Sequence, residues 1–305
     1  MIGKKSAIST MSVISAGVLW GVISLFIKNM SAYGLDAMQI ATLRLIVAAV
    51  VFTVFVLLKD PKLLKFKLKD IWMFLGTGVV SVVLFNMTYF YTMIHSQASV
   101  AVVLLYTSPV FVMIISAFVF KERITVQKIV ALVMTFLGCV FVAGIVGGEM
   151  TVSPFIMFTG ISAGFLYALY TIFGRFALEK YDTATVTAYT FIFGVIGSIP
   201  FGRVLPAAKI VFANPELILY CIGIGIVSTV LPYFFYTWGL ERMESGKAAI
   251  LVAVEPLVGA VIGMTVFHET RNVTKIIGIV LIVGAIVVLN LNFKKQACLE
   301  KTEEE

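Results

Sequence analysis

Ten long apolar runs constrain the fold of this sequence more than any other feature. A helix needs about 20 predominantly apolar residues to cross the roughly 30 Å hydrocarbon core of a bilayer. Each run is close to that length, and only 13% of all residues are charged, against about 25% in soluble domains. We therefore expect an all-α membrane protein with ten transmembrane helices, at residues 9–29, 36–58, 70–93, 97–119, 125–145, 154–174, 183–200, 215–238, 246–267 and 273–291.

The basic residues predict the orientation of these helices, because short positively charged loops stay cytoplasmic. With both termini inside, 17 of the 23 lysines and arginines fall on the cytoplasmic side, 5 fall outside, and Arg44 remains within a run. We expect a multi-pass protein of the cytoplasmic membrane, with residues 295–305 as a cytoplasmic tail. The net charge of +7 then lies in loops beside anionic lipid headgroups, which argues against a nucleic-acid partner.

The sequence also matches itself at an offset of 147 residues. Ser15, Ala16 and Gly17 align with residues 162–164, and Gly76, Gly78 and Ser81 align with residues 223, 225 and 228. The pattern predicts two five-helix repeats, at residues 1–147 and 148–294. Because five is odd, the second repeat enters the membrane inverted. Inverted repeats are typical of alternating-access transporters, whose substrate binds near the midplane between the repeats.

A proline interrupts one predicted helix of each repeat at the same aligned position, Pro109 and Pro256. Proline removes a backbone donor and frees the carbonyl four residues earlier, here that of Leu105 and of Val252. A freed carbonyl is costly in hydrocarbon unless it is buried in protein or lines a polar cavity. We therefore expect both breaks to face the interior.

Two charged residues lie deep within the predicted helices. Glu255 precedes Pro256 near the midplane, where an unpaired charge costs about 2.5 to 3.5 kcal/mol. It either contacts substrate or a coupling proton, or bonds a backbone group or an arginine as a structural acid. Arg44 either clamps a substrate carboxylate or holds a neighbouring helix, and the structural role is favoured.

Aromatic and amide side chains of several helices fall at a similar depth, namely Trp20, Asn86, Tyr106, Tyr167 and Tyr170. We predict that they bind substrate together with Glu255, in a cavity suited to organic cations or to aromatic and apolar solutes. Asn86 serves either substrate or a neighbouring helix. Tyr89, Tyr91, Tyr236 and Trp238 either join this set or, because they lie near helix ends, form an interface belt, so Trp20, Tyr106 and Tyr167 are the stronger candidates.

These pieces, taken in order, resemble the EamA-type members of the drug/metabolite transporter superfamily. The resemblance rests on AGVLWGVISLF, ATLRLIVAAV, the fourth helix with YTSPVFVMIISAFVFKER, and VEPLVGAVIGMTVFHE. It implies a secondary transporter, frequently an exporter of amino acids or related metabolites. The expected partners are a small-molecule substrate, the lipid bilayer and a coupling proton, and a homodimer remains open.

Two other functions remain in view. One is an importer or facilitative carrier of an amine or another small solute. The other is a membrane-embedded enzyme, although the chain has only two histidines, His95 and His268, and no HExxH motif. Its three cysteines have no framework spacing. We expect neither a metal site nor a cofactor.

Overall fold

The computed structural model describes residues 2–96, 98–144, 153–268 and 272–290, and every element within these ranges is helical. The elements are α1 (Ile2–Gly21), α2 (Ile23–Ala32), α3 (Ala37–Lys59), η1 (Pro61–Leu64), η2 (Leu68–Asp70), α4 (Ile71–Leu75), η3 (Gly76–Leu84), α5 (Phe85–His95), α6 (Ala98–Leu105), α7 (Ser108–Val119), α8 (Val126–Val142), α9 (Pro154–Leu178), α10 (Thr183–Ser198), α11 (Val204–Ala213), α12 (Pro215–Gly225), η4 (Ile226–Val230), α13 (Leu231–Leu240), α14 (Ser245–Leu251), η5 (Val252–Val254), α15 (Glu255–Thr265) and α16 (Val273–Asn290). The predicted tail at 295–305 lies outside the described residues.

Within the described residues, eight helical stretches are long and apolar enough to cross a bilayer. They are Ala7–Ala32, Ala37–Lys59, Leu68–His95, Val100–Val119, Pro154–Leu178, Pro215–Leu240, Ser245–Thr265 and Val273–Asn290. The runs expected at 125–145 and 183–200 are also helical, as α8 and α10, but these helices have only 17 and 16 residues. The all-helical membrane fold is therefore as predicted, whereas the count of ten crossings stays a prediction. The short helix α11 was not expected.

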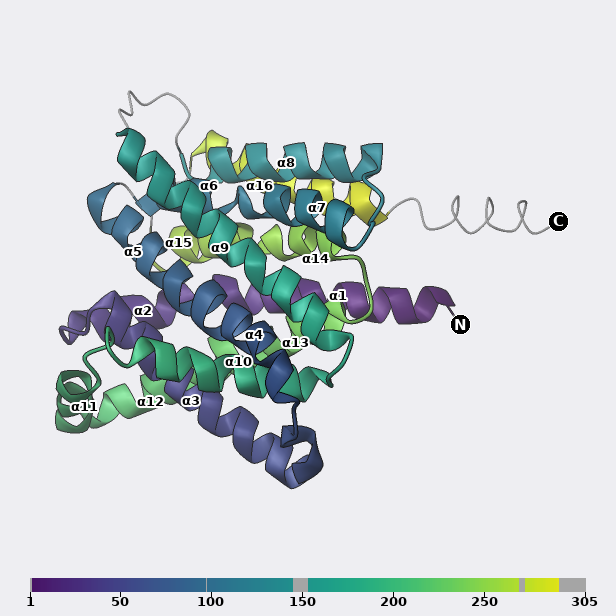
Figure 1. Ribbon diagram of the computed structural model, residues 1–305. Helices are drawn as coiled ribbons and strands as arrows, with labels where there is room; N and C mark the ends of the chain where they lie inside the picture. Colours follow the sequence, from purple (N-terminus) through teal and green to yellow (C-terminus); the bar gives the residue numbers. More distant parts are fainter. Residues whose placement is uncertain (1, 97, 145–152, 269–271, 291–305) are drawn as a thin grey trace.

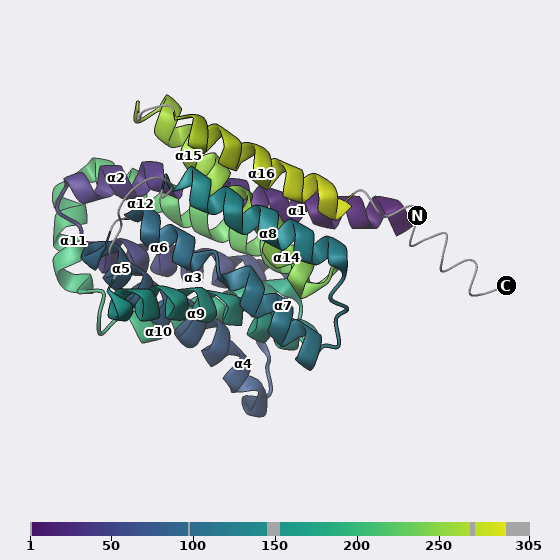
Figure 2. The same ribbon diagram turned by 90° about the horizontal axis from the view of Figure 1, so that it is seen from above.

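The helices form one bundle, and Figures 1 and 2 show the start of α1 and the end of α16 at the same end of it. We call this the predicted cytoplasmic end. Helices α8 and α16 lie side by side along one edge, and α1 packs against α13, α14 and α15. The largest buried cluster includes residues of α1, α3, α9, α10, α13 and α14, so the core spans both halves of the sequence.

Two helices contain π-helical segments at nearly corresponding positions. They are η3, between α4 and α5, and η4, between α12 and α13. Within them the hydroxyl of Ser81 donates to the carbonyl of Gly76 at 2.7 Å, and that of Thr229 donates to the carbonyl of Ile224 at 2.9 Å. Each hydroxyl bonds the carbonyl five residues earlier and so fits the wider turn of a π segment, a feature frequent at functional sites.

Helices α7 and α15 are followed by turns with the same backbone conformation. Lys121 and His268, which align at the 147-residue offset, adopt left-handed conformations with φ of 57° and 52°. The turn at Lys121 brings the carboxylate of Glu122 to the start of α14. There it accepts from the backbone N–H groups of Ser245 at 2.6 Å and Gly246 at 3.1 Å. The two halves of the chain are thus joined at the predicted cytoplasmic end.

Candidate functional site

Two proline-interrupted helices meet α1 and α9 inside the bundle. Helix α14 passes through the 3₁₀ turn η5 into α15, which begins at Glu255 with Pro256 as its second residue. In the first half, α6 ends at Leu105 and α7 begins at Ser108 with Pro109 as its second residue. Both prolines are buried.

Each break is covered by a glycine from the other half of the sequence. A methyl group at Gly17 of α1 would lie 2.6 Å from the carbonyl oxygen of Val252, which accepts from the backbone N–H of Glu255 in the 3₁₀ turn because Pro256 has no N–H to donate. A methyl group at Gly164 of α9 would lie 3.2 Å from the carbonyl oxygen of Leu105, which is freed by the other proline. Only a residue without a Cβ lets these helices approach the two carbonyls so closely, in the manner of Cα–H···O contacts. The two contacts repeat at the same offset on both partners.

Glu255 lies at the second break, and its side chain is half-buried. The hydroxyl of Tyr106 interacts with the carboxylate, but the contact falls short of full hydrogen-bond geometry, and this buried hydroxyl has no other partner in the described part of the chain. Arg44 is close enough to attract the carboxylate electrostatically. Among the described residues, however, the ion pairs within 4.0 Å do not include Glu255 or Arg44.

Arg44 is buried and is held by Asn86. Its Nη2 donates to Oδ1 of Asn86 at 3.4 Å, and Nδ2 of Asn86 donates to the carbonyl of Val82 at 2.6 Å. Asn86 follows the π segment η3, so the local winding of that helix sets where the amide points. Since both ends of the amide bond protein groups, its visible role is to position the guanidinium.

Trp20 anchors an aromatic cluster beside these charges. Its ring centroid lies 5.0 Å from that of Tyr233 and 5.6 Å from that of Tyr236. Tyr170 lies behind Tyr233 at 5.1 Å, and its hydroxyl shares a 2.7 Å hydrogen bond with Oγ1 of Thr237. The hydroxyl of Tyr170 is therefore already occupied, whereas the ring supports Tyr233.

The hydroxyls of Tyr167 and Tyr233 make no hydrogen bond with a described residue, although both lie within electrostatic range of Arg44 and Glu255. Tyr167 is half-buried and packs against Phe85 with ring centroids 5.2 Å apart. A carboxylate, a guanidinium and two unpaired hydroxyls thus surround one region of the interior. This combination can bind a small solute that carries both charge and apolar surface.

Sequence reasoning gave too little weight to two of these aromatic residues. Tyr236 was a weaker candidate than Trp20 because residues near a helix end also suit an interface belt, but it is only 3% exposed and packs against Trp20. Tyr233 was not predicted, although it aligns with Asn86 at the 147-residue offset, and that alignment was a signal that could have identified it. Among the described residues no group of three or more His, Cys, Asp or Glu could hold a metal ion.

Comparison with known proteins yields a consistent set of relatives. The family model described as the EamA-like transporter family matches the sequence twice, at residues 7–144 and 154–291. An uncharacterized transporter of Archaeoglobus fulgidus is 28% identical over 260 residues, which cover 85% of this chain and 90% of the relative. The uncharacterized inner membrane transporter YicL of Salmonella typhimurium is 24% identical over 294 residues, which cover 94% of this chain and 96% of the relative.

One solved structure, a crystal structure of a protein, is similar in fold. It has a TM-score of 0.77 with 15% sequence identity, and the match covers 94% of this chain and 98% of that one. At this identity the likeness concerns the fold alone.

Proposed function

Because this chain belongs to the EamA-like transporter family, we propose that it moves small organic metabolites, amino acids or related compounds, across the cytoplasmic membrane by alternating access. Export is the direction that the family resemblance favours. The proposed moving parts derive from two inverted repeats, at residues 1–147 and 148–294. Both termini are proposed to be cytoplasmic.

The observation that carries this proposal is the separation of Arg44 from Glu255. Two opposite charges within a membrane bundle lower their free energy if they pair directly, since an unpaired charge there costs about 2.5 to 3.5 kcal/mol. These two attract each other but form no ion pair within 4.0 Å. A solute that carries an amine and a carboxylate would form an ion pair with each residue, its amine with Glu255 and its carboxylate with Arg44.

The neighbouring aromatic residues supply the remaining binding surface. Trp20, Tyr106 and Tyr167 present rings or unpaired polar groups toward the same region, and Tyr233 joins them. Rings of this kind bind apolar side chains and attract amines through cation–π contacts. Asn86 and Tyr170 contribute indirectly, because Asn86 positions Arg44 and Tyr170 supports Tyr233.

Glu255 is also suited to carry a coupling proton, because a carboxylate that alternates between substrate and proton links their movements. A facilitative carrier or importer would use the same site without this coupling. A membrane-embedded enzyme would need reactive groups around the substrate, and the site proposed here is built from binding groups. No cofactor is part of the proposal.

Counterflow in proteoliposomes tests the proposal. Vesicles loaded with an unlabelled amino acid should accumulate the labelled compound transiently, and Glu255→Gln and Arg44→Gln should each reduce the initial rate at least tenfold. Glu179→Gln, at an exposed acid at the end of α9, is the matched control and should leave the rate unchanged. Counterflow that survives both site variants would refute the assigned site, and its absence for every amino acid, amine and related metabolite tried would refute the transported class.

A further inference from the structure

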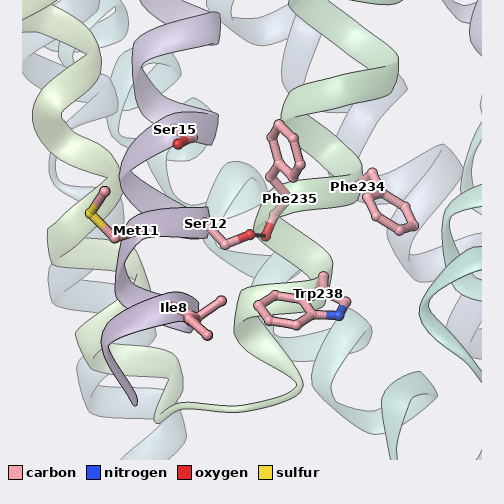
Figure 3. Close-up of a pocket in the computed structure, with 7 residues that line it drawn as sticks. All are labelled: Ile8, Met11, Ser12, Ser15, Phe234, Phe235 and Trp238. Carbon is pink, nitrogen blue, oxygen red and sulfur yellow. Dashed lines mark hydrogen bonds between the residues drawn. The ribbon is translucent and has the colours of Figure 1, made fainter. Parts of the chain in front are cut away.

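A groove runs along the outside of the bundle between α1 and α13, with a volume of about 340 Å³ (Figure 3). Four residues of α1 line one wall and three residues of α13 line the other, namely Ile8, Met11, Ser12, Ser15, Phe234, Phe235 and Trp238. The α1 residues recur every three or four positions and so share one face of that helix. They span about 10 Å along its axis, at about 1.5 Å per residue.

The position of the groove indicates that it faces the lipid bilayer. Both walls belong to helical stretches long enough to cross a bilayer, Ala7–Ala32 and Pro215–Leu240. Ile8 and Met11 are 51% and 66% exposed, so the groove opens outward, away from the candidate substrate site. The hydroxyl of Ser12 donates to the carbonyl of Phe235 at 2.8 Å, which satisfies one polar group of the wall. The surface that remains is mainly apolar and elongated.

A cation lies at the predicted cytoplasmic end of the groove. The guanidinium of Arg242 stacks over the ring of Trp238 at 4.0 Å from its centroid. Nη1 of Arg242 donates to the carbonyl of Trp238 at 2.8 Å and pairs with the carboxylate of Glu241 at 2.5 Å. Within the described part of the chain all of its hydrogen bonds use Nη1. Nε and Nη2 therefore remain to donate to another group, and guanidinium nitrogens suit the oxygens of a phosphate.

We propose that the groove is a binding site for an anionic phospholipid, with one acyl chain between α1 and α13 and the headgroup phosphate against Arg242. The apolar walls match an extended hydrocarbon chain, and the aromatic and cationic pair at one end matches the depth of the headgroup region. The carboxylate of Glu241 repels the phosphate from one edge of the guanidinium and so directs it to Nε and Nη2. This proposal does not depend on which solute the protein moves.

Tryptophan fluorescence provides the test, because the chain has three tryptophans. In the variant Trp20→Phe/Trp72→Phe the emission comes from Trp238 at the groove. In Trp20→Phe/Trp238→Phe it comes from Trp72, which is 42% exposed on α4 and serves as the matched control outside the groove. Each variant is reconstituted in vesicles of phosphatidylcholine and phosphatidylglycerol, in which only one of the two lipids carries bromine on its acyl chains and quenches fluorescence.

At equal mole fraction, brominated phosphatidylglycerol should quench Trp238 with an apparent affinity about fivefold higher than brominated phosphatidylcholine. That fold-change corresponds to about 1 kcal/mol for one arginine at an anionic surface. Arg242→Gln should abolish the preference, whereas Arg123→Gln, which removes an exposed charge elsewhere at the same end, should preserve it. Ser15→Phe, which fills the groove, should reduce quenching by both lipids.

Three outcomes would overturn the proposal. The first is equal quenching of Trp238 by the two lipids. The second is a preference at Trp72 as large as that at Trp238, which would mean ordinary enrichment of anionic lipid around a basic protein. The third is the formation of disulfide-linked dimers by a Met11→Cys variant, in which neither brominated lipid quenches Trp238. That result would mean that a second copy of the chain occupies the groove.

Discussion

Glu122 links the segment after α7 to the start of α14 at the predicted cytoplasmic end of the bundle, so we expect its removal to loosen that end. Its carboxylate accepts from the backbone N–H groups of Ser245 at 2.6 Å and Gly246 at 3.1 Å, at the first turn of α14. Hydrogen bonds to a charged group contribute about 1.5 to 3 kcal/mol each, and loss of a helix N-cap costs about 0.5 to 2 kcal/mol. Because Glu122 is only half-buried, solvent screens part of this. We take about 2 kcal/mol for the contact as a whole.

That free energy translates into a change in accessibility. Glu122→Ala should increase the population in which α7 and α14 are apart by about 30-fold, since 1.4 kcal/mol corresponds to a factor of ten. Glu122→Gln keeps one acceptor oxygen but loses the charge, so we expect an increase of about fivefold, equivalent to about 1 kcal/mol.

Ser245→Cys reports this opening directly. Ser245 is fully buried and its hydroxyl has no hydrogen-bond partner among the described residues, so the substitution changes little while its backbone N–H still donates to Glu122. In a chain whose three native cysteines are alanine, the rate at which a maleimide alkylates Cys at this position measures the exposure of the start of α14. Glu179→Ala serves as the control for loss of an acid. A rate within twofold of the parent for Glu122→Ala, with thermal stability unchanged, would refute the reasoning.

Other contacts give further predictions. Gly164→Ala should lower the melting temperature in detergent, since a methyl there would lie 2.4 Å from a threonine oxygen and 2.9 Å from a backbone carbonyl, and overpacking costs about 1 to 3 kcal/mol. Gly259→Ala is the control, because Gly259 has open space around it, and should leave the melting temperature unchanged. Equal melting temperatures of the two variants would contradict this prediction. Asn86→Ala should raise KM for counterflow about tenfold with a smaller change in kcat, because the arginine it holds is no longer positioned; an unchanged KM would reject that role. The hydrogen bond from Tyr33 to the carboxylate of Glu216 raises the pKa of this exposed tyrosine above its ordinary value. The stabilisation of the fold by this hydrogen bond is therefore present below the ordinary tyrosine pKa and is lost as the pH rises through the raised pKa of Tyr33. Spectrophotometric titration, with Tyr33→Phe subtracted, should show a lower pKa in Glu216→Gln, and no change would refute the assignment.

The apolar runs were sufficient to predict the helices because spanning a bilayer fixes both length and composition. They could not predict the π segments η3 and η4, since an extra residue per turn leaves no trace in hydrophobicity. Those segments alter the rotation of the following residues, which include Asn86 and Tyr233. The contact between Asn86 and Arg44 therefore could not be predicted from the sequence, although both residues were candidates. The burial of Tyr236 could not be predicted either, because distance from a helix end does not reveal whether another helix covers the side chain.

The glycine contacts bear on which parts of the protein form units. The carbonyl of Val252 in the second half is covered by Gly17 of the first half, and that of Leu105 in the first half is covered by Gly164 of the second. The Val252 carbonyl also accepts from Glu255 within its own half, so the contact from Gly17 adds close packing, whereas the contact from Gly164 shields the freed carbonyl of Leu105 from hydrocarbon. Each half thus packs against the break of the other even though their sequences repeat. If these contacts persist during transport, α1 must move together with α14 and α15, and α9 must move with α6 and α7. The rigid bodies of alternating access are then assembled across the repeat boundary, so the sequence halves and the moving units do not coincide.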